Sequence, residues 1–169
     1  MDIFYLDIDL FINSGIIQGK TKYEKEHNAG LYIIEYASKN FFNILNNEIE
    51  IVNKKPRFKY SDMHFSISHS HNIAAVCFDK NDTGFDIEFI KNRNWQKISE
   101  RMNFNLQKNS IEEFYKCWTR YEAEFKLQKK AKNTLTLIKG NYAISIASEN
   151  ELEIKPEFYY IKNVHKHYV

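Results

Sequence analysis

Hydrophobic residues recur with two different periods along this chain of 169 residues. Several short runs alternate apolar with polar positions, which is the pattern of a β-strand that buries one face. These runs predict strands at residues 2–11, 49–52, 63–67, 73–78 and 85–90, and two or three more between 135 and 169. Elsewhere apolar residues recur every three to four positions, as in amphipathic helices.

The second period predicts helices at residues 22–45, 95–102 and 110–130. The last helix has the clearest start, because Ser110 is a good N-cap and Glu113 follows three residues later, as in a capping box. Its predicted core face includes Trp118 and Phe125.

The order of these elements predicts an α+β fold in a single domain. A strand, a helix and several strands are followed by a second set of helix and strands, so we expect two similar α/β halves. The first half is expected at about residues 1–80 and the second at about residues 81–169.

The composition narrows the class of protein. With 43% hydrophobic residues the chain can bury a core, which argues against disorder throughout. The net charge of +2 argues against a protein that coats nucleic acid. The sequence lacks a recognisable signal peptide and an apolar run of roughly 20 residues. Its two cysteines form no CxxC pair, so we expect a reducing cytoplasm.

Two carboxylates lie close together in the sequence GFDIE, residues 84–88. On a strand, Asp86 and Glu88 share one face while Ile87 points to the other. A cation between them would relieve their repulsion, and Mg²⁺ binds a few carboxylates together with substrate phosphates. Alternatively, the two side chains line a solvated strand edge beside lysines of a neighbouring strand.

The helical sequence CWTRYEAEFK, residues 117–126, carries a second candidate set. Trp118, Glu122 and Lys126 are spaced i, i+4 and i+8 and therefore lie along one helix face. Glu122 could be a third metal ligand or a general base, and Lys126 could hold a phosphate. The alternative is an ordinary Glu–Lys helix pair, worth about 0.2–0.5 kcal/mol.

A third candidate is FSISHS, residues 65–70, which begins in the predicted strand at 63–67 and ends before the one at 73–78. His69 can donate to a phosphate oxygen, assisted by the hydroxyl groups of Ser68 and Ser70 and by the N–H groups of a turn. The alternative is a turn histidine with a local structural role. The basic cluster at residues 54–57 is likewise a solvated turn or a phosphate clamp.

In this order, FSISHS, GFDIE and W-x-x-x-E-A-x-x-K resemble the motifs of the 4′-phosphopantetheinyl transferase superfamily. That family has a Ser-His-Ser turn, a G-x-D-x-E strand and a helix reading W-x-x-K-E-A-x-x-K, and KKPRF is similar to its G-K-P segment. The resemblance covers residues 54–126. It is closest to compact members of the Sfp-type branch, which implies two halves related by a pseudo-twofold axis and a monomeric enzyme.

The resemblance implies a reaction and its partners. Such enzymes transfer 4′-phosphopantetheine from coenzyme A to a serine of an acyl or peptidyl carrier protein, and 3′,5′-ADP leaves. Carriers of this kind serve fatty acid, polyketide and peptide biosynthesis. The implied cofactor is Mg²⁺, or Mn²⁺ in its place.

The resemblance also implies roles for individual residues. The metal ligands are Asp86, Glu88 and Glu122, and the catalytic residues are Glu122, Lys126 and His69. The residues that bind coenzyme A are Lys55, Ser68, His69 and Lys126, with Lys22 and Lys25 as candidates for the 3′-phosphate.

Three departures from the family pattern affect the coenzyme site. Tyr121 replaces a lysine, although Arg120 is adjacent. Lys54 replaces the glycine of G-K-P. The first helix lacks the usual arginine, and Lys22 and Lys25 are its candidate substitutes.

Other functions fit some of the same residues. A Mg²⁺-dependent phosphohydrolase would use the carboxylates without a carrier protein. A non-catalytic module would bind coenzyme A or a carrier protein, with Tyr121 marking lost catalysis. A nucleic-acid binder built on residues 126–132 is disfavoured by the nearly balanced charge. The lysines of that stretch dock the acidic helix of a carrier or form a solvated helix end.

Overall fold

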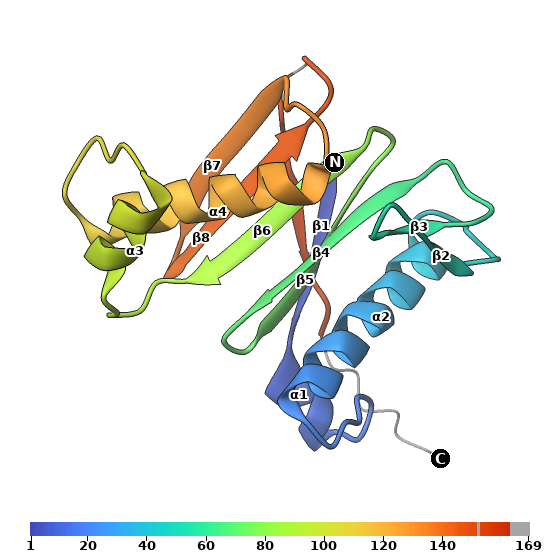
Figure 1. Ribbon diagram of the computed structural model, residues 1–169. Helices are drawn as coiled ribbons and strands as arrows, with labels where there is room; N and C mark the ends of the chain where they lie inside the picture. The colour runs from blue at the N-terminus through green and yellow to red at the C-terminus, as the bar shows by residue number, and fades with distance from the viewer. Residues whose placement is uncertain (152, 163–169) are drawn as a thin grey trace. The chain divides into compact units, whose positions relative to one another are not determined.

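A computed structural model describes residues 1–151 and 153–162 of the chain. These residues form two compact units, one of Met1–Lys80 together with the chain from Lys155 onward and one of Asn81–Ile154. Helices and mainly antiparallel sheets in both units confirm the predicted α+β class (Figure 1).

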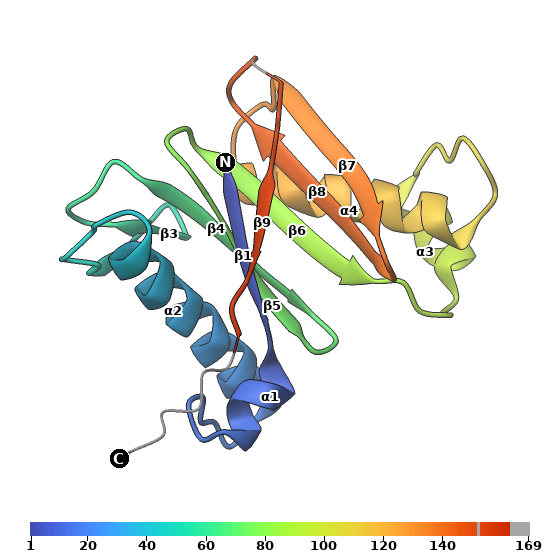
Figure 2. The same cartoon turned by 180° about the vertical axis from the view of Figure 1, so that it is seen from behind.

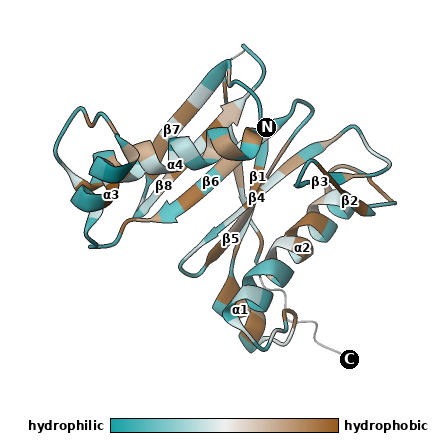
Figure 3. Ribbon diagram, in the orientation of Figure 1, coloured by the Kyte–Doolittle hydropathy of each residue, from teal (hydrophilic) through white to brown (hydrophobic). Residues whose placement is uncertain are grey.

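The first unit is built on a four-stranded sheet in the order β4-β5-β1-β9. Its strands are β4 (His64–Ser70), β5 (Ile73–Asp79), β1 (Asp2–Asp7) and β9 (Glu157–Tyr160). The long helix α2 (Lys22–Asn40) packs on β5, β1 and β4, and alternates apolar with polar segments along its length (Figure 3). Phe4, Phe65, Phe78 and Ile33 are among the fully buried side chains of this core.

The C-terminal strand differs from the expected division of the chain. Strand β9 pairs in parallel with β1, from Asp2 opposite Glu157 to Tyr5 opposite Tyr160. The two strands lie side by side in both views (Figures 1 and 2). The second unit therefore ends at Ile154 instead of extending to 169, and residues 163–169 lie outside the described residues.

The first predicted strand ends early. Strand β1 stops at Asp7, and helix α1 (Ile8–Asn13) follows directly. The Asp7 carboxylate accepts a hydrogen bond from the Leu10 N–H, so it caps the helix. Helix α2 begins at Lys22 behind a capping box and ends at Asn40, five residues before the predicted end. Two short strands, β2 (Ile49–Val52) and β3 (Lys55–Phe58), form a separate ribbon.

The second half of FSISHS, residues 68–70, is strand and not turn, which corrects the expectation that the strand ends at Ile67. Strand β4 pairs with β5 up to Ser70 opposite Ile73, so the loop consists of His71 and Asn72 alone. His71 has a left-handed φ of 57°. The Asn72 amide donates to Asp7, and its backbone oxygen accepts from Ile8, so the loop is held against the start of α1.

The second unit is a three-stranded antiparallel sheet covered by one long helix. The strand order is β6-β8-β7, with β6 at Thr83–Phe89, β8 at Tyr142–Ser148 and β7 at Asn133–Lys139. Helix α4 (Ile111–Leu127) contacts all three strands, and α3 (Trp95–Met102) packs beside it. The core around Trp95, Phe114 and Tyr115 contains Trp118 at its margin, but Phe125 is 70% exposed, so its predicted core position is wrong.

In the described part of the chain, none of the helices has both the length and the apolar character needed to cross a membrane.

Candidate functional site

The predicted carboxylates share one face of strand β6, and helix α4 covers that face. Asp86 is directly opposite Ser145 of β8, and the Ser145 hydroxyl contacts Thr119 of α4 at 2.8 Å. Side chains of directly paired residues lie on the same face of a sheet. Asp86 is therefore on the helix-facing side, where only 5% of the residue is exposed.

Gly84 brings the helix onto this strand. A Cβ atom at position 84 would lie 1.8 Å from the backbone oxygen of Ala123 and 2.6 Å from the backbone nitrogen of Leu127. Such distances are impossible for real atoms, so only glycine permits the contact. Because Ala123 follows Glu122 and Leu127 follows Lys126, this close approach sets the distance of both functional side chains from Asp86. The close packing of α4 on β6 thus explains why the two sequence motifs have small residues at Gly84 and Ala123.

Lys126 and Asp86 form a direct ion pair across this contact. The Lys126 ammonium donates to Asp86 Oδ1 at 2.8 Å, over a sequence separation of 40 residues. The Lys126 side chain is 29% exposed and the Asp86 side chain 7%. A hydrogen bond in which both partners are charged is stronger than a neutral one. The structure therefore brings together two residues that the sequence predicted separately.

The charges of Asp86, Glu88 and Lys126 also act on the carboxyl group of Glu122. Burial raises the pKa of the Glu122 carboxyl group above its ordinary value, and the nearby charges of Asp86 and Glu88 raise it further, while Lys126 opposes them. The three predicted carboxylates are thus within electrostatic reach of one another. A carboxylate with a raised pKa is a better proton acceptor near neutral pH than an ordinary one.

A chain of hydroxyl groups starts from Ser145, the residue directly opposite Asp86, and sequence reasoning missed it. The Ser145 hydroxyl contacts Thr119 Oγ1 at 2.8 Å and Thr136 Oγ1 at 2.9 Å, and Thr119 and Ser145 are fully buried. The three residues come from α4, β8 and β7. No local pattern in the sequence marks them, because only strand register and helix packing place them together.

The carboxylates of the site are suitable ligands for a divalent cation, but their side chains are not arranged to bind one. Carboxylate oxygens are the preferred protein ligands of Mg²⁺. Among the residues that the structure describes, no three His, Cys, Asp or Glu side chains stand close enough to hold a metal ion as they are. A cation bound by Asp86 would compete with the Lys126 ammonium for the same carboxylate.

The first unit contains the second group of predicted residues. His69, on β4, has its Nδ1 atom 3.5 Å from Glu26 Oε2, and Glu26 Oε1 lies 3.4 Å from Lys22 Nζ. Glu26 thereby links two residues predicted to bind coenzyme A. Sequence reasoning missed Glu26, although its position one helix turn after Lys22 was a usable signal.

The remaining predicted coenzyme residues are placed differently from His69. Successive strand residues point to opposite faces, so Ser68 lies on the other face of the sheet from His69, and it is buried. Lys55, on β3, is only 5% exposed, which is rare for lysine. Lys25 is half-buried in the first turns of α2. The structure therefore associates His69 with Lys22 and not with Ser68.

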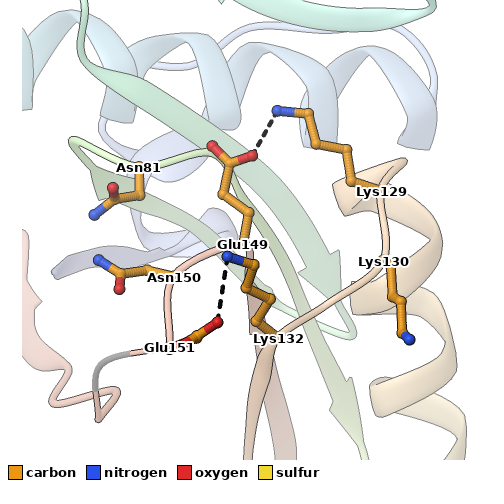
Figure 4. Close-up of a pocket in the computed structure, with 7 residues that line it drawn as sticks. All are labelled: Asn81, Lys129, Lys130, Lys132, Glu149, Asn150 and Glu151. Carbon is orange, nitrogen blue, oxygen red and sulfur yellow. Dashed lines mark hydrogen bonds and ion pairs between the residues drawn. The ribbon is translucent and has the colours of Figure 1, made fainter.

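A polar hollow of about 740 Å³ lies beyond the C-terminal end of α4 (Figure 4). Its lining residues are Asn81, Lys129, Lys130, Lys132, Glu149, Asn150 and Glu151. Lys129 pairs with Glu149 at 2.7 Å and with buried Asp82 at 3.3 Å, and Lys132 pairs with Glu151 at 3.4 Å. The hydrogen bond to Glu149 raises the pKa of Lys129 and lowers that of Glu149. Two of the three lysines are thus already partnered by carboxylates.

Comparison with known proteins supports the motif resemblance. No protein-family model matches the chain. A curated protein of Haemophilus influenzae named "Putative 4'-phosphopantetheinyl transferase" is 36% identical over 86 residues, which cover 44% of this chain and 37% of that protein. The chain thus matches just over a third of the length of this relative. The similarity supports placing the chain in the 4′-phosphopantetheinyl transferase superfamily.

Proposed function

We propose that this protein is an enzyme that transfers 4′-phosphopantetheine from coenzyme A to a serine of an acyl or peptidyl carrier protein. The observation that carries the proposal is the contact of α4 with β6, where Gly84 and Ala123 touch and Asp86 meets Lys126. The contact joins the two motifs that resemble the family most closely. The partial relative, which is named "Putative 4'-phosphopantetheinyl transferase", also supports it.

In this reaction the serine oxygen forms a bond to the β-phosphorus of coenzyme A, and the bond from that phosphorus to the 3′,5′-ADP oxygen breaks. The serine proton needs an acceptor. Glu122 is the candidate base, because burial and its acidic neighbours raise the pKa of its carboxyl group. It accepts the proton directly or through a water molecule.

Negative charge on the phosphate oxygens needs positive partners. Lys126 provides one, and its present bond to Asp86 keeps the ammonium group at the site until a phosphate is bound. His69 and Lys22 are the candidate phosphate donors of the first unit. Asp86, Glu88 and Glu122 would hold Mg²⁺, which stabilises charge on a pyrophosphate when bound.

The test is the intact mass of an apo carrier protein after incubation with the enzyme, coenzyme A and Mg²⁺. We expect a mass gain of one phosphopantetheine group, and we expect Glu122→Gln to lower the rate at least 100-fold, as the loss of a general base does. Glu124→Gln is the matched control, because Glu124 is exposed on the same helix and its carboxylate accepts a hydrogen bond from Thr134, away from Asp86 and Lys126.

Other outcomes identify the rival functions. Release of phosphate from coenzyme A without modification of the carrier indicates a phosphohydrolase. Binding of coenzyme A with neither reaction indicates a non-catalytic module. Unmodified carriers of the fatty acid, polyketide and peptide types, together with no coenzyme binding, would contradict the proposal.

A further inference from the structure

Glu26 is a buried acid that lies beside His69 and Lys22 and has no role in the reaction described so far. Only 9% of the residue is exposed, although the next two helix residues, His27 and Asn28, face solvent. Acidic residues are rarely so buried unless they are paired. One carboxylate oxygen lies 3.5 Å from His69 Nδ1 and the other 3.4 Å from Lys22 Nζ.

The packing of α2 on β4 fixes where Glu26 stands. A Cβ atom at Gly30 would lie 3.0 Å from Ile67 Cγ2, so the helix is close to the strand at this point. Four residues back along the helix, about 6 Å, is Glu26. Two residues forward along the strand, about 6.6 Å, is His69. Because the two distances are similar, the Glu26–His69 pair lies on the same row of contacts between α2 and β4 as the Gly30–Ile67 pair.

The carboxylate determines which part of the imidazole is available. When one ring nitrogen of a histidine is engaged by a carboxylate, that interaction sets the orientation of the ring and the position of its proton. With Nδ1 directed to Glu26, Nε2 points away from the carboxylate. The His69 side chain is 40% exposed, so a ligand can reach it.

We propose that Glu26 is a positioning residue that holds His69 so that Nε2–H donates to a phosphate group of coenzyme A. This rests on the proposed function. In the proposed complex the ring carries both protons, with Nδ1–H directed to Glu26 and Nε2–H to the phosphate, and the second Glu26 oxygen keeps the Lys22 ammonium beside the same site. Lys22 is 78% exposed and remains able to turn to a bound phosphate.

The experiment measures the affinity of the full chain for coenzyme A and for 3′,5′-ADP by calorimetry. Glu26→Ala retains a good helix former, and we expect it to raise Kd about tenfold, which is the lower end of the cost of losing a histidine's orienting carboxylate at metal sites. Glu26→Gln retains an acceptor for Nδ1–H and should recover part of the affinity. Glu35→Ala is the matched control, because Glu35 is an exposed acid of the same helix that pairs with Lys39.

The combination with His69→Ala separates positioning from a structural role. If Glu26 acts through His69, the double variant Glu26→Ala/His69→Ala binds coenzyme A as His69→Ala alone does. In the wild type with bound coenzyme A, nitrogen NMR of the His69 ring should show protons on both Nδ1 and Nε2, and Glu26→Ala should change this pattern. An equal loss of affinity in the His69→Ala background, or an unchanged ring spectrum, would overturn the inference.

The wild-type measurement distinguishes this inference from the function on which it rests. Wild-type protein that binds neither coenzyme A nor 3′,5′-ADP contradicts the proposed function and the inference together. Wild-type binding with unchanged affinity in Glu26→Ala contradicts the inference alone.

Discussion

The two compact units use the same type of contact with opposite chemistry. In each, a long helix approaches one strand at a glycine, and a charged side chain of the helix meets a polar side chain of that strand. In the first unit the glycine is on the helix, and the helix supplies the acid Glu26 to the strand residue His69. In the second the glycine is on the strand, and the helix supplies Lys126 to the acid Asp86.

The difference lies in how tightly each contact is packed. A methyl group at Gly30 would meet a side-chain methyl at 3.0 Å, whereas at Gly84 it would meet backbone atoms at 1.8 and 2.6 Å. A side chain can change its rotamer, but the backbones of α4 and β6 are each held by the hydrogen bonds of their own helix or sheet. The contact in the second unit therefore tolerates an added methyl group less well than the contact in the first, and it positions Glu122 and Lys126.

The largest effect is expected at Gly84. We expect Gly84→Ala to lower the free energy of unfolding by at least about 3 kcal/mol, the upper part of the range for overpacked sites, because α4 must move away from β6. Urea denaturation followed by circular dichroism measures it. A loss below about 1 kcal/mol would show that α4 does not lie on β6 as closely as described.

The next effect is expected at the Asp86–Lys126 pair. Asp86→Asn should lower the free energy of unfolding by about 1–3 kcal/mol, because it removes the charged partner of a partly buried ammonium group. A double-mutant cycle with Lys126→Met isolates the coupling between the two side chains. Additive effects would show that the pair contributes no stability, and the contrast with the Glu26–His69 pair would lose its basis.

Substitution of Glu122 should raise the stability of the protein at pH 7, in contrast to substitution of Asp86. Its folded-state pKa is raised, so the stability associated with this group is fully present below its ordinary pKa of 4.5 and falls as the pH rises through the raised value. Glu122→Gln should therefore melt at a higher temperature than the wild type at pH 7, and the difference should disappear below about pH 4. Thermal melts across pH 3.5–8, a range set by the ordinary carboxyl values, test this. A wild type more stable than the variant at pH 7 would contradict the assigned pKa shift.

The smallest effect is expected at Gly30. Gly30→Ala gains up to about 1 kcal/mol of helix propensity, and the close contact with Ile67 offsets part of it. The net change should stay within about 1 kcal/mol in either direction. Measured beside Gly84→Ala, it tests the comparison directly, because similar losses at both glycines would mean that the two contacts are equally tight.

Much of the local structure followed from the sequence. The N-cap of α4 at Ser110, the start of α2 at Lys22 and the extent of α3 agree with capping residues and helical periodicity. The motif resemblance is likewise local, and the partial relative supports it. Periodicity also placed Glu122 and Lys126 on one helix face, where they lie in the structure.

Local patterns failed where a neighbouring element decided the outcome. Phe125 has the spacing of a core residue, yet it is 70% exposed, because α4 turns Ala123 and Leu127 toward the sheet at the Gly84 contact. The end of FSISHS, residues 68–70, has the composition of a turn, yet β5 pairs with it up to Ser70 and extends the strand. That pairing moves Ser68 and His69 to opposite faces.

The sequence by itself determined which residues can carry charge and protons, and which helix or strand bears them, because periodicity and capping act over a few neighbouring residues. The tertiary structure alone decided which of them meet. Lys126 and Asp86 are 40 residues apart, and Glu26 and His69 are also distant in sequence. Such pairs depend on how closely a helix lies on a sheet, and that distance depends on side-chain volume at one glycine in each contact. No pattern within either segment encodes the partner that the other segment brings.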